Sequence, residues 1–330
     1  MMRIGIVGCG NIASTLAPVM NHYPEVMRIE AAASRSKEKA EEFASRFSIG
    51  KAYGSYEELY EDPDVDIVYV ATPHSHHREI MLDALNHGKH ILCEKAFCVN
   101  AAEAREVFAL AKEKNLYVAE AIWTRYMPSR KMIKDIIDSG RIGEVKSITA
   151  NLGYTIIQKP RISEPSLAGG ALLDVGVYPL NFTLMAMEGT PVSTLTGTCV
   201  KTEKGVDERS FINITFKSGA QASVYSEACC VTDRKGIIYG TNGHIEVTNV
   251  NNPEKIEVFS GDRNPVLLET IEITHEVNGY EYELLSAANC IAEGKIEDPH
   301  MPWSETLRVL TYTDALREIW KIKLAGELEE

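Results

Sequence analysis

The first third of the chain alternates short apolar runs with longer amphipathic stretches. Runs rich in Ile, Val and Ala have the length of buried strands, namely Arg3–Val7, Ile29–Ala33, Ile67–Ala71, His90–Cys93 and Tyr117–Ala119. Between them, apolar positions recur at helical spacing over Lys37–Phe47, Glu79–Asn86 and Ala101–Lys114. Ser55 and Glu58 form a capping box that predicts a short helix ending near Glu61. Strict alternation of strand and helix predicts a parallel sheet with right-handed crossovers.

The pattern changes after about Arg125. A predicted helix over Ser129–Ser139 is followed by a long strand near Val145–Tyr154 and by a helix over Leu172–Met187, which Gly169-Gly170 introduces. Strands separated by polar turns then follow one another, namely Arg209–Phe216, Ala220–Ala228, Gly236–Tyr239, His244–Val247 and Lys255–Phe259. This succession predicts an antiparallel meander. Helices are predicted over Glu281–Glu293 and Ser304–Leu324.

These patterns place the protein in the α/β class with two domains. We expect residues 1–122 to form a Rossmann domain with a parallel sheet. We expect residues 123–330 to form an α+β domain with a large, mainly antiparallel, open-faced sheet. A chain of 330 residues is long enough for two such domains. The helix over residues 304–324 is a candidate to pack back on the Rossmann domain.

Net charge and cysteine content bear on the expected binding partners and on the cellular compartment. The formal net charge is −13, with acidic residues spread along the chain and no basic cluster, so neither nucleic acid nor an anionic membrane surface is an expected partner. No apolar run has the length of a membrane span, and Met1–Val7 continues into the predicted fold without the features of a signal peptide. Seven scattered cysteines fit neither a zinc site nor a disulfide framework. We therefore expect a cytoplasmic protein with reduced thiols.

A glycine-rich turn follows the first predicted strand. Gly8-Cys9-Gly10-Asn11-Ile12-Ala13 fits the G-x-G-x-x-A variant of the dinucleotide-binding fingerprint. The first glycine allows a tight turn, the second lets a pyrophosphate approach the backbone, and the helix N-terminus faces the phosphates. Such a string is a weak signal by itself, but its place between a strand and a helix predicts a dinucleotide site that includes Gly8, Cys9, Gly10, Asn11 and Ile12.

The end of the second strand bears on the choice of cofactor. NAD enzymes usually carry Asp or Glu there to hold the ribose 2′-hydroxyl, whereas this chain has Ser34, Arg35, Ser36 and Lys37. Hydroxyls and a guanidinium can bind a 2′-phosphate through charge-assisted hydrogen bonds. Ser34 and Arg35 therefore favour NADP over NAD. The alternative is a solvated loop with an incidental arginine.

Four further segments form a pattern in order and spacing: Ala71-Thr72-Pro73-His74, Glu94-Lys95-Ala96, Glu120–Arg125 and Gly169–Tyr178. The pattern resembles the glucose-fructose oxidoreductase, inositol dehydrogenase and rhizopine-catabolism (Gfo/Idh/MocA) family, over essentially the whole chain. The segment around Trp123 and the tyrosine at position 178 are most similar to its dimeric trans-dihydrodiol dehydrogenase and NADP-dependent D-xylose dehydrogenase branch. The resemblance implies an NAD(P)-dependent enzyme, but it is a poor guide to the substrate.

The resemblance also implies catalytic roles for three residues. Lys95 would lie beside the nicotinamide, where an ammonium polarises a carbonyl oxygen or takes part in proton transfer once burial lowers its pKa; the alternative is a surface lysine. Tyr178 stands where many members have His and would act as acid or base on the substrate hydroxyl; the alternative is a buried tyrosine with a satisfied hydroxyl. Asp174, four residues earlier on a helix, would bind substrate hydroxyls.

Further cofactor-facing residues follow from the same resemblance: Ala71, Thr72, Pro73, His74, His77, Glu94, Lys95, Trp123 and Arg125. Trp123 and Arg125 are expected near the nicotinamide and the pocket wall, with a core residue or an ion pair as the alternative. Family members usually have Pro after the lysine, so Ala96 is expected to loosen the placement of Lys95. His74, His76 and His77 invite a metal interpretation, but no ligand set completes them, and no metal is expected.

The sequence thus predicts hydride transfer between NADP(H) and a hydroxyl or carbonyl carbon of a sugar or cyclic diol. One alternative is a non-catalytic NADP-binding sensor or regulatory protein; another is an enzyme of the same fold acting on an inositol or a sugar phosphate, which Lys159 and Arg161 could bind. The family pattern further implies a homodimer or larger assembly through the open face of the C-terminal sheet. The apolar positions expected on that face include Phe211, Ile212, Val224 and Ile238.

Overall fold

The computed structural model describes residues 1–261 and 263–324, so residue 262 and residues 325–330 of the predicted second domain lie outside the described residues. The chain divides into two compact units. Of the described residues, unit 1 comprises Met1–Tyr126 and Glu276–Leu310, and unit 2 comprises Met127–His275 and 311–324. Residues 123–330 were predicted as the second domain, with the helix over 304–324 as a candidate to pack back on the first. In the structure 276–310 belongs to unit 1, and the start of the last helix packs there.

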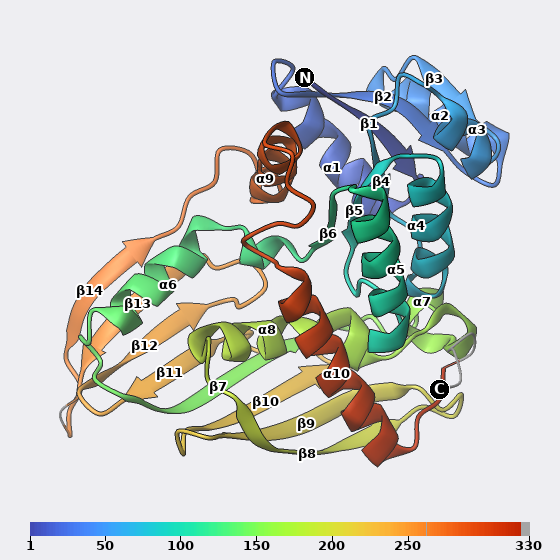
Figure 1. Ribbon diagram of the computed structural model, residues 1–330. Helices are drawn as coiled ribbons and strands as arrows, with labels where there is room; N and C mark the ends of the chain where they lie inside the picture. The colour runs from blue at the N-terminus through green and yellow to red at the C-terminus, as the bar shows by residue number, and fades with distance from the viewer. Residues whose placement is uncertain (262, 325–330) are drawn as a thin grey trace. The chain divides into compact units, whose positions relative to one another are not determined.

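Unit 1 contains the predicted parallel sheet. Its strands run in the order β3-β2-β1-β4-β5-β6, and every neighbouring pair is parallel (Figure 1). The strands are β1 (Met2–Val7), β2 (Met27–Ala33), β3 (Lys51–Tyr53), β4 (Ile67–Val70), β5 (His90–Glu94) and β6 (Val118–Ala121). Only β3 was not predicted, because three residues are too few to display a strand pattern. This strand order brings the ends of β1 and β4 side by side, which is where doubly wound sheets bind nucleotides.

Two apolar clusters cover the two faces of this sheet. Alternate strand residues such as Ile4 and Ile6 pack with α1 (Asn11–His22), α2 (Lys37–Phe47) and α9 (Glu281–Ala292). Strand residues such as Val68 and Val70 pack with α3 (Tyr56–Glu61), α4 (His77–Asn86), α5 (Ala101–Lys114) and the start of α10 (Trp303–Trp320). The predicted capping box is confirmed, because the Glu58 N–H donates to the Ser55 hydroxyl at 3.3 Å and the Ser55 N–H donates to the Glu58 carboxylate at 3.0 Å.

Unit 2 is built on a mixed sheet with the strand order β14-β13-β12-β11-β7-β10-β9-β8 (Figure 1). Its strands are β7 (Val145–Gly153), β8 (Val192–Lys201), β9 (Asp207–Phe216), β10 (Gln221–Glu227), β11 (Gly236–Gly240), β12 (Gly243–Thr248), β13 (Lys255–Ser260) and β14 (Leu267–Glu272). The mainly antiparallel sheet is confirmed, but it is not an uninterrupted meander. β7 lies between β10 and β11 and pairs with β10 in parallel.

Helices cover one face of this sheet, whereas no helix within residues 1–261 and 263–324 covers the other, which we call the open face. α8 (Val177–Ala186) packs on β7, β10 and β11, and α6 (Pro128–Asp138) packs on α8 (Figure 1). Of the four apolar residues expected on the open face, Ile212, Val224 and Ile238 are instead fully buried, and only Phe211 is exposed. Because side chains alternate along a strand, the adjacent Phe211 and Ile212 necessarily point to opposite faces.

A helical stretch over Pro165–Ala186 has the length and apolar composition of a membrane span, but 94% of its most apolar window is buried within the protein. This stretch contains the turn η3 (Pro165–Leu167), the π-helical turn η4 (Leu172–Gly176) and α8. Its apolar side chains therefore serve as core residues.

Candidate active site and cofactor-binding loops

The two glycines of the turn after β1 differ in whether the surrounding protein would tolerate a side chain. Gly8 has φ +98°, and a Cβ there would lie 2.8 Å from the backbone oxygen of Ala71. Gly10 has φ −94°, which any residue can adopt, and no protein atom lies within 4 Å of where its Cβ would stand. The packing of the protein thus requires glycine at position 8 but not at position 10. At Gly10 the missing side chain leaves room for a ligand to approach the backbone.

The remaining fingerprint residues form the start of α1. Asn11 and Ile12 begin the helix, whose N-terminus has no side-chain cap, and Ala13 is buried against the sheet. The Cys9 thiol lies 3.7 Å from the Ala33 backbone oxygen and joins this turn to the end of β2. Uncapped N–H groups in the first turn of a helix favour an anion such as a pyrophosphate.

The loop after β2 places an unpaired cation at the surface. Arg35 is exposed and forms no hydrogen bond or ion pair with any of residues 1–261 and 263–324. The Ser34 hydroxyl accepts a hydrogen bond from the Ser36 N–H at 3.4 Å. A hollow of about 470 Å³ extends from Arg35 between α3 and α4, and its lining includes Tyr56, His76 and Ile80. Apolar and basic groups are therefore both present beside Arg35.

The loop after β4 carries Ala71, Thr72 and Pro73, followed by the turn η1 (His74–His76). The Thr72 methyl group lies against the position that a Gly8 Cβ would occupy, so this loop touches the glycine turn. The buried hydroxyls of Thr72 and Ser75 have no hydrogen-bond partner within the described part of the chain. A buried hydroxyl without a partner is costly, and a bound polar ligand would satisfy it.

His74 and His77 connect this loop to the turn that carries Lys95. The His77 Nε2 lies 2.8 Å from the Thr72 oxygen, and its Nδ1 lies 3.0 Å from the Ala96 oxygen. The His74 Nε2 lies 3.2 Å from the Lys95 oxygen. The Lys95–Ala96 peptide is cis. The structure therefore brings together the segments around Gly8, Thr72, His77 and Lys95, all at the carboxyl edge of the sheet.

Buried carboxyl groups hold the other side of the Lys95 turn. Glu94 accepts a hydrogen bond from the Tyr69 hydroxyl, and burial raises the pKa of Glu94 to about 7. Glu120 accepts from the Phe97 N–H at 3.2 Å and from the Thr306 hydroxyl at 2.9 Å, and burial raises its pKa. Both groups are acceptors in an apolar interior, so they fix the backbone on either side of Lys95.

Trp123 and Arg125 lie in the turn η2 (Trp123–Arg125) after β6, and both are buried. Trp123 stacks on Tyr280, with ring centroids 3.9 Å apart and an 8° angle between planes. The Arg125 Nη2 donates to the Glu305 carboxylate of α10 at 2.7 Å. Trp123 is thus a buried residue stacked within this unit, while Arg125 joins the turn after β6 to α10 by an ion pair.

Asp174 and Tyr178 belong to unit 2. Asp174 lies in the π-helical turn η4, is almost fully buried, and forms an ion pair with Arg161 of α7 (Pro160–Ser163). Tyr178 is the second residue of α8 and is 8% exposed. Because Arg161 is engaged with Asp174, it is not a free cation for a sugar phosphate.

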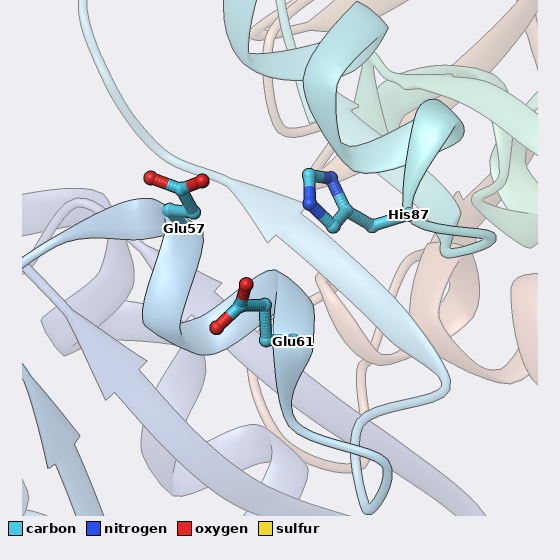
Figure 2. A group of neighbouring side chains, drawn as sticks. All are labelled: Glu57, Glu61 and His87. Carbon is cyan, nitrogen blue, oxygen red and sulfur yellow. The ribbon is translucent and has the colours of Figure 1, made fainter.

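A group of metal-ligand residue types occurs in unit 1 outside these loops. Figure 2 shows Glu57 and Glu61 on α3 and His87 just beyond α4, and one potential ligand atom from each lies within 4.8 Å of the others. All three side chains are exposed. Exposed acidic groups of this kind are common in an acidic protein, so we assign no metal to them. The ring nitrogens of His74 and His77 face the carbonyl oxygens described above.

Three buried residues received no role from the sequence: Tyr69 and Glu120, which contact the Lys95 turn, and Asp207, which contacts the Leu172 segment of unit 2. Tyr69 and Glu120 are polar side chains in short, otherwise apolar strands, and that contrast was the available signal. Asp207, at the start of β9, accepts a hydrogen bond from the Leu172 N–H at 2.7 Å. No local pattern connects position 207 with the segment around Leu172.

Comparison with known proteins agrees with this geometry. The model of the oxidoreductase family with an NAD-binding Rossmann fold (GFO_IDH_MocA) matches residues 2–121, and the GFO/IDH/MocA C-terminal domain model matches residues 131–246. A trans-1,2-dihydrobenzene-1,2-diol dehydrogenase of Xenopus tropicalis is 34% identical over 320 residues, covering 96% of the chain and 97% of the relative. The human protein of the same name is 32% identical over 324 residues, covering 97% and 96%.

A solved structure is similar over the same extent. KijD10, a 3-ketoreductase from Actinomadura kijaniata in complex with NADP and TDP-benzene, is 25% identical and has a TM-score of 0.85. The similarity covers 96% of this chain and 97% of that chain. The fold is therefore shared over nearly the full length of both proteins.

Proposed function

Because the chain belongs to the Gfo/Idh/MocA family of NAD(P)-dependent oxidoreductases, we propose that it transfers hydride between NADP(H) and a hydroxyl or carbonyl carbon of a sugar or cyclic diol. One observation carries this proposal. Contacts run from Gly8 through Thr72 and His77 to the Lys95–Ala96 peptide, so the phosphate-binding turn and the turn of the candidate catalytic lysine form one connected edge.

The residues of this edge fit a dinucleotide. The open space at Gly10 and the uncapped start of α1 would receive the pyrophosphate, and the Thr72 hydroxyl would gain a partner. NADP(H) supplies the hydride acceptor or donor when bound. Cys9, Asn11, Ile12, Ala71, Pro73, His74, Glu94, Trp123 and Arg125 complete the proposed cofactor-binding set.

We propose NADP in preference to NAD. Arg35 has no partner among the described residues and stands where NAD enzymes carry an acidic residue, and Ser34 adds a hydroxyl beside it. A 2′-phosphate would give this exposed guanidinium a charge-assisted hydrogen bond. The A. kijaniata 3-ketoreductase was solved with NADP.

Three residues are proposed to act on the substrate. In the oxidative direction, the substrate C–H bond breaks with its electron pair leaving as hydride, and the hydroxyl proton passes to a base. We assign that base to Tyr178, with Lys95 stabilising the negative charge on the substrate oxygen and Asp174 binding a neighbouring hydroxyl. The family resemblance and the buried position of Asp174 and Tyr178 support these assignments.

The proposed substrate class rests on the relatives and on the buried carboxylate of Asp174. The curated relatives named above are dehydrogenases of a cyclic diol, and the A. kijaniata enzyme is a ketoreductase. A carboxylate such as Asp174 has several lone pairs and could accept from a substrate hydroxyl beside its ion pair with Arg161. We further propose a cytoplasmic enzyme, because all seven cysteines are free thiols, as a reducing compartment requires.

We also propose a homodimer or larger assembly formed through the open face of the unit 2 sheet. Phe211 is 53% exposed there and stacks on Tyr225 at 5.0 Å, while His244 stacks on Phe259 at 4.6 Å. Aromatic side chains gathered on an uncovered sheet face are typical of a protein–protein interface.

The test is a panel of aldoses, inositols, cyclic diols and TDP-sugars, assayed by NADPH and NADH absorbance. With the most active substrate, Lys95→Ala and Tyr178→Phe are each expected to lower kcat/KM by about 100-fold or more, as loss of general acid–base groups does. Lys131→Ala, at an 80% exposed side chain, and Tyr312→Phe are matched controls. Full turnover in both test variants would refute the assignment. Tight NADPH binding with no turnover across the panel would favour a sensor.

A further inference from the structure

Gly169 and Gly170, which introduce the helix of Asp174 and Tyr178, lie against two fixed oxygen-bearing groups. A Cβ on Gly169 would overlap the backbone oxygen of Ile162, and a Cβ on Gly170 would overlap the Asp207 carboxylate. Gly170 has φ +124° and donates its N–H to the Ile162 oxygen at 2.9 Å. The two glycines are therefore required by close approach, and one of the approaching groups is a side chain from a different part of the sequence.

That side chain is buried and faces the start of the helical segment. Asp207 is 2% exposed, and its Oδ2 accepts from the Leu172 N–H at 2.7 Å. Burial raises the pKa of Asp207 to about 6, against the stabilising N–H groups of Leu172 and Ala171 and the charge of Arg317. Burying a carboxylate costs free energy unless it is hydrogen-bonded. The N–H groups at the start of the helical segment supply those hydrogen bonds.

The segment that Asp207 holds begins with an unusual turn. Residues Leu172–Gly176 form a π-helical turn that carries Asp174, and α8, with Tyr178 as its second residue, follows without a break. The Asp174 N–H points to the Gly170 oxygen at 3.4 Å, and the Asp174 carboxylate is paired with Arg161 of α7. The placement of the turn is therefore fixed at its start by Asp207 and at its side by α7. π turns of this kind are frequent at functional sites.

Building on the proposed function, we propose that Asp207 is a positioning residue for the reaction: its carboxylate anchors the first N–H groups of the π turn and so sets the placement of Asp174 and Tyr178. Asp207 does not itself touch the substrate in this proposal. It acts through the backbone of Ala171 and Leu172 and the helix behind them. A shift of about 1 Å in a reacting group can lower turnover about 100-fold.

The experiment compares Asp207→Ala, which removes the acceptor, with Asp207→Asn, which keeps one acceptor oxygen. Asp207→Ala is expected to lower kcat roughly 10- to 100-fold. Asp207→Asn is expected to lie between it and wild type. The Kd for NADPH should stay within about twofold in both, because the cofactor loops belong to unit 1. Asp233→Ala is the matched control, since Asp233 also accepts a backbone N–H in unit 2, from Lys235 at 3.1 Å.

Two further measurements separate positioning from general stability. Hydrogen exchange of the amides over 171–178 should speed up in Asp207→Ala but not in Asp233→Ala. In a Tyr178→Phe background, Asp207→Ala should lower kcat little further, because the Tyr178 hydroxyl that Asp207 is proposed to position is already absent. Full kcat in Asp207→Ala, or losses that add fully in the double variant, would overturn the proposal. If Tyr178→Phe alone leaves turnover intact, the base role proposed for Tyr178 fails, whatever Asp207→Ala does. If the wild type turns over no substrate of the panel, the proposed function fails instead.

Discussion

The imidazole Nδ1 of His77 lies 3.0 Å from the backbone oxygen of Ala96, the residue after Lys95. Through its other nitrogen, 2.8 Å from the Thr72 oxygen, the same ring reaches the loop that contacts Gly8. His77 is fully buried, and this burial lowers its pKa from 6.5 to about 4. The ring thus lies between two loops of the proposed cofactor site. As a neutral imidazole it can donate to only one of the two oxygens, and its titration should be visible in folding stability.

We predict that His77 makes the protein less stable as the pH falls from 6.5 toward 4. In that window the unfolded chain binds a proton at His77 and the folded protein does not, so protonation favours unfolding. The cost should reach roughly 3 kcal/mol at the lower end. The free energy of unfolding is measured in urea for wild type and His77→Gln at pH 7 and pH 4.5. Other titrating groups are common to both proteins, so the difference between their pH dependences reports the contribution of His77. Equal pH dependence in the two would contradict the prediction.

The two glycines of the turn should respond differently to alanine. Gly8→Ala forces a Cβ toward the Ala71 oxygen at a φ of +98°, so the free energy of unfolding should fall by about 2 kcal/mol or more. Gly10→Ala meets no protein atom and should cost less than about 1 kcal/mol, but it should weaken NADPH binding about 10-fold or more. Urea unfolding without cofactor and NADPH fluorescence titration distinguish the two effects. A Gly10→Ala protein with unchanged NADPH affinity would argue against pyrophosphate at this turn.

Arg35 should determine the preference for NADPH. Arg35→Ala is expected to raise the Kd for NADPH about 10- to 100-fold, which corresponds to the loss of a charge-assisted hydrogen bond. The Kd for NADH should stay within about threefold. Arg46→Ala, in the last turn of the helix α2 that follows the Arg35 loop, is the control and should change neither. Tighter binding of NADH than NADPH by the wild type would refute the role given to Arg35.

A charge on the open face of the unit 2 sheet should separate the protomers. Phe211→Glu is expected to weaken self-association at least about 10-fold, because burial of a phenyl ring is lost and a carboxylate would have to be desolvated. Sedimentation velocity measures this directly. Ile319→Glu, at a residue of nearly the same exposure on α10, is the control. A wild type that stays monomeric at micromolar concentration would remove the basis for this interface.

Many elements could be predicted because the relevant signal is local. α2 and α5 match their predicted bounds, since a helix displays its apolar stripe and capping residues within one segment. The glycine turn is equally local, because Gly8 and Gly10 act through their own backbone. The helix over Leu172–Met187 was predicted as one piece and is a π turn followed by α8, since the anchoring carboxylate of Asp207 is distant in sequence.

By itself, the sequence determined the alternation of strands and helices, the dinucleotide turn and the family pattern, because periodicity and backbone constraints are properties of neighbouring residues. Tertiary structure alone decided that α9 returns to the first sheet, that β7 lies between β10 and β11, and that His77 joins the Thr72 and Lys95 segments. The physical reason is that these features depend on which distant segments pair. An apolar run in the sequence indicates that the segment is buried, but it does not indicate which distant segment packs against it.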